Sequence, residues 1–143
     1  RLKHKVRYGV IAMISRFVLT ALDDIKNVTG GVISGVSRRA PLSDERRYNI
    51  ALIMNELLAN SFEHARPTPA NPVFVQAELS GDVLRIGVTD GGAGFDYLEQ
   101  NEEAPDDAAL FQERGRGLRL VRALCSDICY NDAGNSVVVS IAL

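Results

Sequence analysis

The sequence contains no tryptophan and only two cysteines among its 143 residues. Cys125 and Cys129 form neither a CxxC pair nor a cluster with histidine, and a zinc site needs more ligands. We therefore interpret them as reduced thiols, which favours a reducing cytoplasm as the location of the protein. No apolar run reaches the roughly 18–20 residues that span a bilayer, so no contact with a membrane is expected.

The chain also lacks an excess of either charge. Its formal net charge is −2, which leaves no broad basic surface for nucleic acid. With 46% hydrophobic and 24% charged residues, the composition is that of one ordinary globular domain that needs no metal or disulfide to fold. We expect residues 1–16 to be an N-terminal extension or linker within a longer protein, and residues 17–143 to form the domain.

Two helices are predicted in the first half of the chain. Apolar residues recur near the helical period across Thr20–Arg39, and Pro41 closes this segment. Ser43 is a suitable N-cap for a second helix, because acidic residues follow it in the first turn. This helix ends before Pro67, and one apolar stripe defines its buried face: Ile50, Ile53, Met54, Leu57, Leu58, Phe62 and Ala65.

A strand pattern follows the second helix. Val73–Leu79 and Val83–Thr89 alternate apolar and polar residues around a tight turn at Gly81, which predicts a β-hairpin. The stretch Gly91–Gly117 is rich in glycine and acidic residues, and a loop of this length is typical of a functional lid or a disordered insert. The remaining predicted elements are a short helix and two closing strands: Leu118–Cys125, Ile128–Asn131 and Val137–Leu143.

The second helix carries polar residues that its apolar stripe does not require. Glu56 and Asn60 are four residues apart and therefore project from the same face, and His64 continues that edge. A carboxylate and an amide oxygen one turn apart can accept a proton from a nucleophile and bind a hard cation. An ordinary solvated helix face is the alternative interpretation.

Two glycine motifs stand on either side of the expected lid. Asp90-Gly-Gly-Ala-Gly94 follows a strand directly, and its three glycines let the backbone approach a flat ligand or a phosphate, while Asp90 can accept a hydrogen bond from an exocyclic amine. Gly115-Arg-Gly117 stands just before a predicted helix, where free backbone amides and the helix dipole favour a phosphate. Each motif taken alone is also compatible with an ordinary turn.

In this order the motifs resemble the GHKL ATPase superfamily of gyrase, chaperone, histidine-kinase and mismatch-repair ATPases. Glu56–His64 resembles its N box, Asp90–Gly94 its first glycine box and Gly115–Leu118 its second. The resemblance runs from Thr20 to Leu143. Within the superfamily the chain looks most like the small bacterial anti-sigma-factor serine/threonine kinases, which share the compact length, the short lid and a second box of the GRGL type.

The resemblance implies a fold, a reaction and partners. The fold would be an α+β two-layer sandwich with a mixed, mostly antiparallel sheet and helices on one face. The protein would be a kinase that uses ATP and Mg²⁺ and phosphorylates an anti-anti-sigma (STAS) protein on serine, or it would bind a sigma factor. Dimerisation is common among such kinases, so a homodimer is possible.

The resemblance also implies residue roles. Glu56 would be the general base, Asn60 would hold Mg²⁺, and Asp90 would bind the adenine amine. The sequence departs from the family pattern at Ala93, and the turn Gly134–Ser136 lacks the usual glycine–threonine pair. The other residues placed at the nucleotide are His64, Gly92, Gly94, Gly115, Arg116, Gly117, Leu118 and Ser136, the last in place of a threonine near the base.

Two other functions remain open. The chain resembles the catalytic domain of a sensor histidine kinase, which would require a phosphoacceptor histidine on an upstream helical hairpin; His4 lacks the acidic context of such a histidine. A domain that binds nucleotide and sequesters a partner without turnover is the second alternative. Glu56 argues against it, because a pure binding module does not need a general base.

Overall fold

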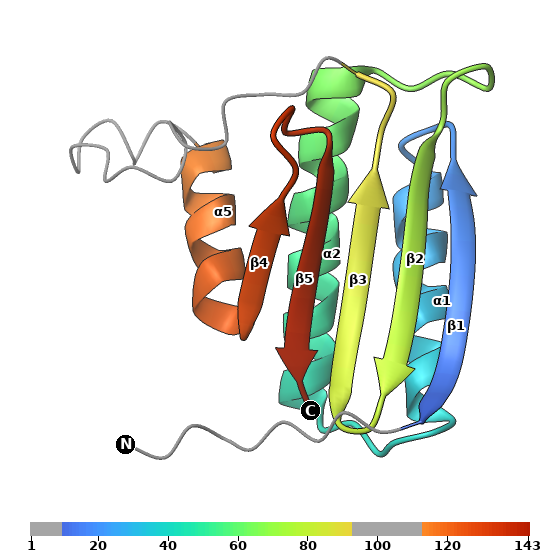
Figure 1. Cartoon of the computed structure of the whole chain (residues 1–143), viewed down its shortest axis with the longest axis vertical. Coiled ribbons are helices and arrows are strands. Elements are labelled where there is room, and N and C mark those ends of the chain that lie inside the picture. The colour runs from blue at the N-terminus through green and yellow to red at the C-terminus, as the bar shows by residue number, and fades with distance from the viewer. Residues whose placement is uncertain (1–9, 93–112) are drawn as a thin grey trace.

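The computed structural model describes residues 10–92 and 113–143. Within them an antiparallel sheet forms one layer and the helices α1 and α2 cover one of its faces, with α5 beside the end of the sheet (Figure 1). The expected α+β two-layer sandwich is therefore confirmed. The elements are β1 (Ile11–Leu19), α1 (Asp24–Ser37), α2 (Asp44–Ala65), β2 (Val73–Ser80), β3 (Val83–Thr89), α5 (Glu113–Leu124), β4 (Asp127–Tyr130) and β5 (Ser136–Ala142).

The sheet has the strand order β1-β2-β3-β5-β4, and each neighbouring pair of described strands is antiparallel. The predicted hairpin is formed by β2 and β3, with Ser80 paired to Val83 across the turn. Gly81 has a φ of 59° at the first of the two turn residues, where a two-residue hairpin of type II′ needs glycine. After α5 the chain forms the edge strand β4, and β5 then lies between β4 and β3.

Helix α2 forms as its sequence predicts. The Ser43 side chain caps it by accepting a hydrogen bond from the Arg46 backbone N–H at 3.1 Å. The helix ends at Ala65, and the C-cap residue Arg66 has a left-handed φ of 48° directly before Pro67. Its apolar stripe is packed in the core against the inward side chains of the strands, with Leu58 fully buried. Because this face of α2 is packed in the core, polar residues of the helix lie on its other faces.

Residues 11–16, which were expected to belong to an N-terminal extension or linker, form the first part of β1. The strand pairs along its length with β2, and Met13 is buried in the core. A Cβ at Gly35 of α1 would lie 2.9 Å from the Met13 sulfur, so α1 can lie this close to β1 because it carries glycine there. The sequence hides the strand because its outward residues Ile14 and Val18 are apolar too, which removes the alternation.

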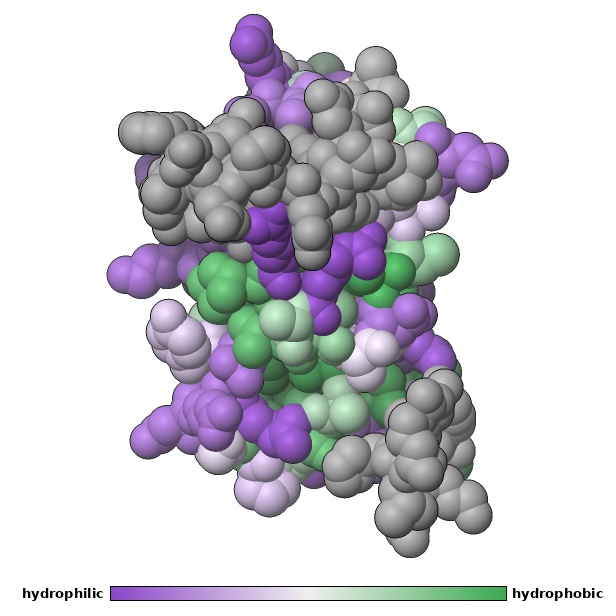
Figure 2. Space-filling view, turned by 90° about the vertical axis from the view of Figure 1, so that its left-hand side faces the viewer, coloured by the Kyte–Doolittle hydropathy of each residue, from purple (hydrophilic) through white to green (hydrophobic). Residues whose placement is uncertain are grey.

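Helix α5 packs against α2 through one buried face. Leu118 and Val121 are fully buried, whereas Leu120 is 46% exposed. The side of the molecule that carries α5 and β4 shows a hydrophobic area framed by hydrophilic residues (Figure 2). Among the helices of residues 10–92 and 113–143, none combines the length and the apolar character needed to cross a bilayer.

Candidate functional site

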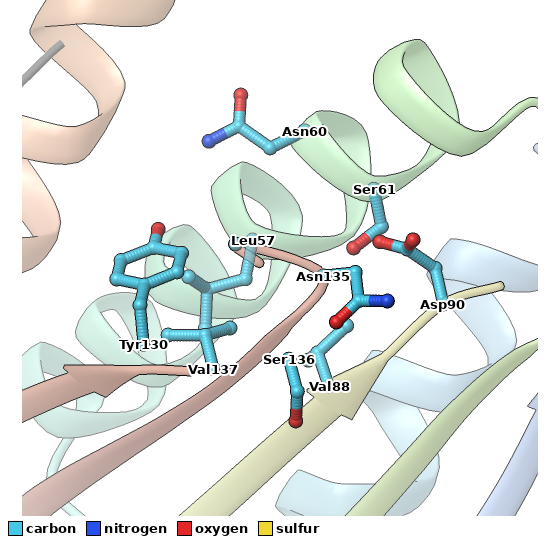
Figure 3. A pocket seen from close by; sticks show the side chains of 10 residues that line it. Leu57, Asn60, Ser61, Val88, Asp90, Tyr130, Asn135, Ser136 and Val137 are labelled. Carbon is cyan, nitrogen blue, oxygen red and sulfur yellow. The ribbon is translucent and has the colours of Figure 1, made fainter. Parts of the chain in front are cut away.

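The polar residues of the second half of α2 and of the first glycine motif meet at one end of the sheet. There, α2 faces the end of β3 and the turn between β4 and β5 (Figure 3). The cavity between them has a volume of about 10 Å³, room for about one water molecule, so it accommodates only the edge of a larger ligand. Its polar lining includes Asn60, Ser61, Asp90 and Asn135, and its apolar lining includes Leu57, Val88 and Val137.

Asp90 is held in this cavity by its own backbone and by the glycine motif. It lies directly after β3 and is 9% exposed. Its backbone N–H donates to the Asn135 carbonyl at 2.9 Å, and its Oδ1 accepts the Gly92 N–H at 2.9 Å. The other carboxylate oxygen, Oδ2, is of the type that accepts a hydrogen bond from a ligand amine. Ser61 of α2 points toward the same carboxylate (Figure 3).

The first glycine motif needs glycine because it runs close to other segments. A Cβ at Gly92 would lie 3.0 Å from both Cα and Cβ of Ala65, in the last turn of α2. A Cβ at Gly91 would overlap the side chain of Asn71, which belongs to the loop after α2. The motif is therefore packed onto the end of α2, and Asp90 lines the same cavity as Asn60. Gly94, predicted to shape the same pocket, lies outside the described residues.

Asn60 and Glu56 occupy the same face of α2, as their spacing predicts. Asn60 is 3% exposed and lines the cavity. Glu56 is half-buried, and its carboxylate lies against Gly117 of α5, where a Cβ would collide with it. A side chain on α5 at this point would displace the carboxylate. Asn60 therefore lines the same cavity as Asp90, whereas Glu56 lies one turn away at the contact between α2 and α5.

The second glycine motif lies within α5 and not before it, which corrects the sequence prediction. The helix begins at Glu113, so Gly115 is in its first turn and Gly117 in its second. Only the first four backbone N–H groups of a helix lack an intrahelical acceptor, so Gly115 keeps a free amide and Gly117 does not. Helix boundaries follow from tertiary contacts as well as from local propensity, and here α5 is packed on α2.

Of three further predicted residues, two do not line the cavity and the third has a side chain that the structure does not describe. Leu118 is fully buried in the interior and is not part of the cavity lining. His64 is half-buried in the last turn of α2 and does not line the cavity either. The backbone of Arg116 is helical, and its side chain is outside what the structure describes.

Ser136 contributes its backbone to the cavity, but its side chain lies on the opposite face of the sheet. Its hydroxyl is hydrogen-bonded to that of Thr89 at 2.8 Å. Figure 3 shows the Ser136 side chain directed away from Asn60 and Asp90. Because strand side chains alternate between faces, Val137 points inward instead. The side chain that reaches the Gly92 carbonyl from this turn is that of Asn135, which sequence reasoning missed. Its position directly after Gly134 was the only available signal.

Tyr130 is a second residue that sequence reasoning missed. It projects from β4 and lines the cavity on the side away from Asp90 (Figure 3). Burial raises the pKa of its phenol to about 12, an effect that the positive charge of Arg122 partly offsets. Nothing in the periodicity of the short strand distinguishes it from an ordinary core residue.

This raised pKa predicts how stability depends on pH. The unfolded phenol ionises near pH 10 and the folded one near 12. Stability from the neutral phenol is therefore fully present below pH 10 and is lost as the pH rises from 10 to 12. The measurement is an absorbance titration of tyrosinate combined with thermal unfolding. Tyr130→Phe should remove the late-titrating step and flatten this pH dependence; a step retained in the variant would assign it to another tyrosine.

Among the described residues, no group of three or more histidine, cysteine, aspartate or glutamate side chains is arranged to hold a metal ion. A divalent cation at this site would therefore share its coordination with ligand oxygens, and the amide oxygen of Asn60 is of the type that Mg²⁺ accepts. Asn60 is buried and lines the same cavity as Asp90, which fits such a shared site.

Comparison with known proteins identifies clear relatives. Residues 20–141 match the model of the histidine kinase-like ATPase domain, a range that includes all the site residues described above. The serine-protein kinase RsbW of Listeria innocua is 30% identical over 115 residues, which cover 76% of this chain and 73% of that protein. The serine-protein kinase RsbW of Listeria monocytogenes serotype 4a shows the same identity and coverage.

Proposed function

Because this chain belongs to the family of histidine kinase-like ATPase domains, we propose that it is a protein serine kinase and anti-sigma factor. It binds Mg²⁺-ATP and phosphorylates a serine of an anti-anti-sigma partner of the STAS type in the cytoplasm. Its relatives that are called serine-protein kinases support the reaction class. The observation that carries the proposal is the Glu56 carboxylate against Gly117, one turn from Asn60 and close to the cavity that holds Asp90.

Asp90 recognises the adenine edge. Its Oδ1 is occupied by the Gly92 N–H, and Oδ2 accepts a hydrogen bond from the exocyclic amine. The small cavity admits this edge and excludes the rest of the nucleotide, which then extends along α2 toward α5. The first-turn amides of α5, including that of Gly115, provide donors and the positive end of the helix dipole for the phosphates.

Asn60 holds the cation and Glu56 handles the proton. The Asn60 amide oxygen would bind Mg²⁺ together with phosphate oxygens, and the ion supplies neutralisation of the charge on the transferring group. The Glu56 carboxylate accepts the proton of the substrate serine hydroxyl. The serine oxygen then forms a bond to the γ-phosphorus while the bond to ADP breaks. A module that only sequesters a partner would have no use for this carboxylate.

Calorimetric titration with ATP, with and without Mg²⁺, tests the nucleotide site. We expect the wild-type protein to bind ATP more tightly with Mg²⁺. Asp90→Asn should weaken binding at least roughly tenfold, because it removes a hydrogen bond to a charged acceptor. Asp127→Asn, a matched change on the exposed residue that begins β4, should leave the affinity unchanged.

Two results of these experiments would contradict the proposed kinase. A well-folded wild-type protein that binds no ATP would exclude a nucleotide-dependent function. Binding without transfer of phosphate to any STAS-domain protein would instead favour the sequestering module.

A further inference from the structure

The turn between β4 and β5 is organised by one exposed side chain, that of Asn131. Its Oδ1 accepts hydrogen bonds from three consecutive backbone N–H groups, those of Gly134, Asn135 and Ser136, at 2.9, 3.0 and 3.1 Å. Its backbone N–H donates to the Ser136 carbonyl at 2.9 Å. Because three donors converge on Oδ1, the amide of Asn131 can adopt only one orientation, with Nδ2 directed away from them.

The orientation of the Asn131 amide affects the first glycine motif through a series of hydrogen bonds. Asn131 Nδ2 donates to Asn135 Oδ1 at 2.6 Å, which in turn fixes the Asn135 amide. Asn135 Nδ2 then donates to the Gly92 carbonyl at 3.2 Å, across 43 residues of sequence. The Gly92 N–H donates to Asp90 Oδ1 at 2.9 Å, and the Asp90 N–H closes the cycle on the Asn135 carbonyl at 2.9 Å. The turn and the glycine motif are thus one hydrogen-bonded unit.

Each link in this unit depends on the one before it. If the Asn135 amide rotated by half a turn, its oxygen would face the Gly92 carbonyl, and two acceptors would repel each other. Two contacts therefore select the observed orientation, the Nδ2 donor of Asn131 and the Gly92 carbonyl, and the Asn135 side chain has no other hydrogen bond among the described residues. Asn131 itself does not line the cavity. Its effect on a ligand must therefore act through Asn135 and Gly92.

We propose that Asn131 is a positioning residue that fixes the direction of the Asp90 carboxylate and so sets the selectivity of the site for adenine over guanine. This inference rests on the proposed nucleotide-binding function. Adenine presents an amine to the carboxylate, whereas guanine presents a carbonyl oxygen, which the carboxylate repels. The discrimination between the two depends on where the carboxylate oxygens point, so a loosened Asp90 discriminates less.

Asn131→Asp separates the two functions of this side chain. Aspartate keeps the Oδ acceptor that the three N–H groups of the turn require, but it lacks the Nδ2 donor to Asn135. We expect the melting temperature to change little and the ratio of GTP to ATP dissociation constants, measured by calorimetry, to fall about three- to tenfold, the change expected for one neutral hydrogen bond. The added negative charge affects ATP and GTP equally, so it cancels in the ratio.

A double-variant cycle shows whether Asn131 acts through Asn135. Asn135→Ala should lower the same ratio, and adding Asn131→Asp to it should cause no further loss. An Asn131→Asp protein with wild-type selectivity overturns the proposal, as does a wild-type protein that binds ATP and GTP equally well. In both of these cases nucleotide binding itself survives. Wild-type protein that binds neither nucleotide would instead remove the proposed function and this inference with it.

Discussion

Glu56→Gln is expected to reduce the rate of phosphate transfer by about 10²- to 10⁴-fold, the usual contribution of a general base. Glutamine keeps the size and the planar end of the side chain, so the packing against Gly117 is preserved. Only the ability to accept a proton is lost. The affinity for Mg²⁺-ATP should stay within a few-fold of wild type, because Asp90 and Asn60 make the proposed nucleotide contacts. The measurement is single-turnover transfer of labelled phosphate to a STAS-domain partner, beside an ATP titration.

The same helix offers a matched control. Glu63 lies on α2 seven residues further along, is exposed, and lies outside the cavity lining, so Glu63→Gln should transfer phosphate at the wild-type rate. If Glu56→Gln also transfers phosphate at the wild-type rate, another group accepts the proton. If it fails to bind ATP, Glu56 contributes to binding rather than to proton transfer.

Gly117→Ala should have a comparably large effect through geometry alone. The new Cβ would collide with the Glu56 carboxylate, so either that side chain or α5 must move. A displacement of about 1 Å in a catalytic group can cost on the order of 10² in rate. Alanine is also about 1 kcal/mol better than glycine inside a helix, so α5 does not lose helix propensity. We therefore expect a folded protein that binds ATP and transfers phosphate poorly.

Gly30→Ala is the control for the substitution itself. Gly30 lies within α1, and a Cβ there would meet nothing within 4 Å. It should raise the melting temperature through helix propensity and leave phosphate transfer unchanged. Wild-type transfer by Gly117→Ala would mean that the position of Glu56 against α5 is not the catalytic one. Thermal unfolding of both variants separates a loss of rate from a loss of fold.

Much of the fold can be predicted from the sequence, because the residues that start, end and pattern its elements are close together in the chain. Ser43 caps α2 as its residue type predicts, and the stripe that includes Leu58 has the helical period. Gly81 marks the hairpin turn because glycine tolerates the positive φ required there. The first strand was missed because Ile14 and Val18 on its exposed side are apolar, so apolar and polar residues do not alternate along it. Pairing with β2 is what identifies it as a strand.

The candidate site, too, was predictable from the sequence only where its signals are local. The one-turn spacing of Glu56 and Asn60 places them on one face of a helix whatever else the chain does. Their distance from Asp90 cannot be predicted from local sequence, because it depends on how Gly91 and Gly92 pack onto the end of α2. The start of α5 was also misplaced, because glycines permit both a loop and a helix and the contact with α2 selects the helix.

The sequence by itself determined the chemistry at this site: a carboxylate and an amide on α2, an aspartate after a strand, and glycines where the backbone must approach closely. Only the tertiary structure decided which other side chains lie next to these residues. Asn135 and Ser136 are adjacent in the chain, yet only the Asn135 side chain reaches the first glycine motif, at the Gly92 carbonyl, because the register of β5 against β3 turns the Ser136 hydroxyl to Thr89 on the opposite face. A shift of one residue in that register would exchange the two faces, and register is fixed by burial of side chains far apart in the sequence.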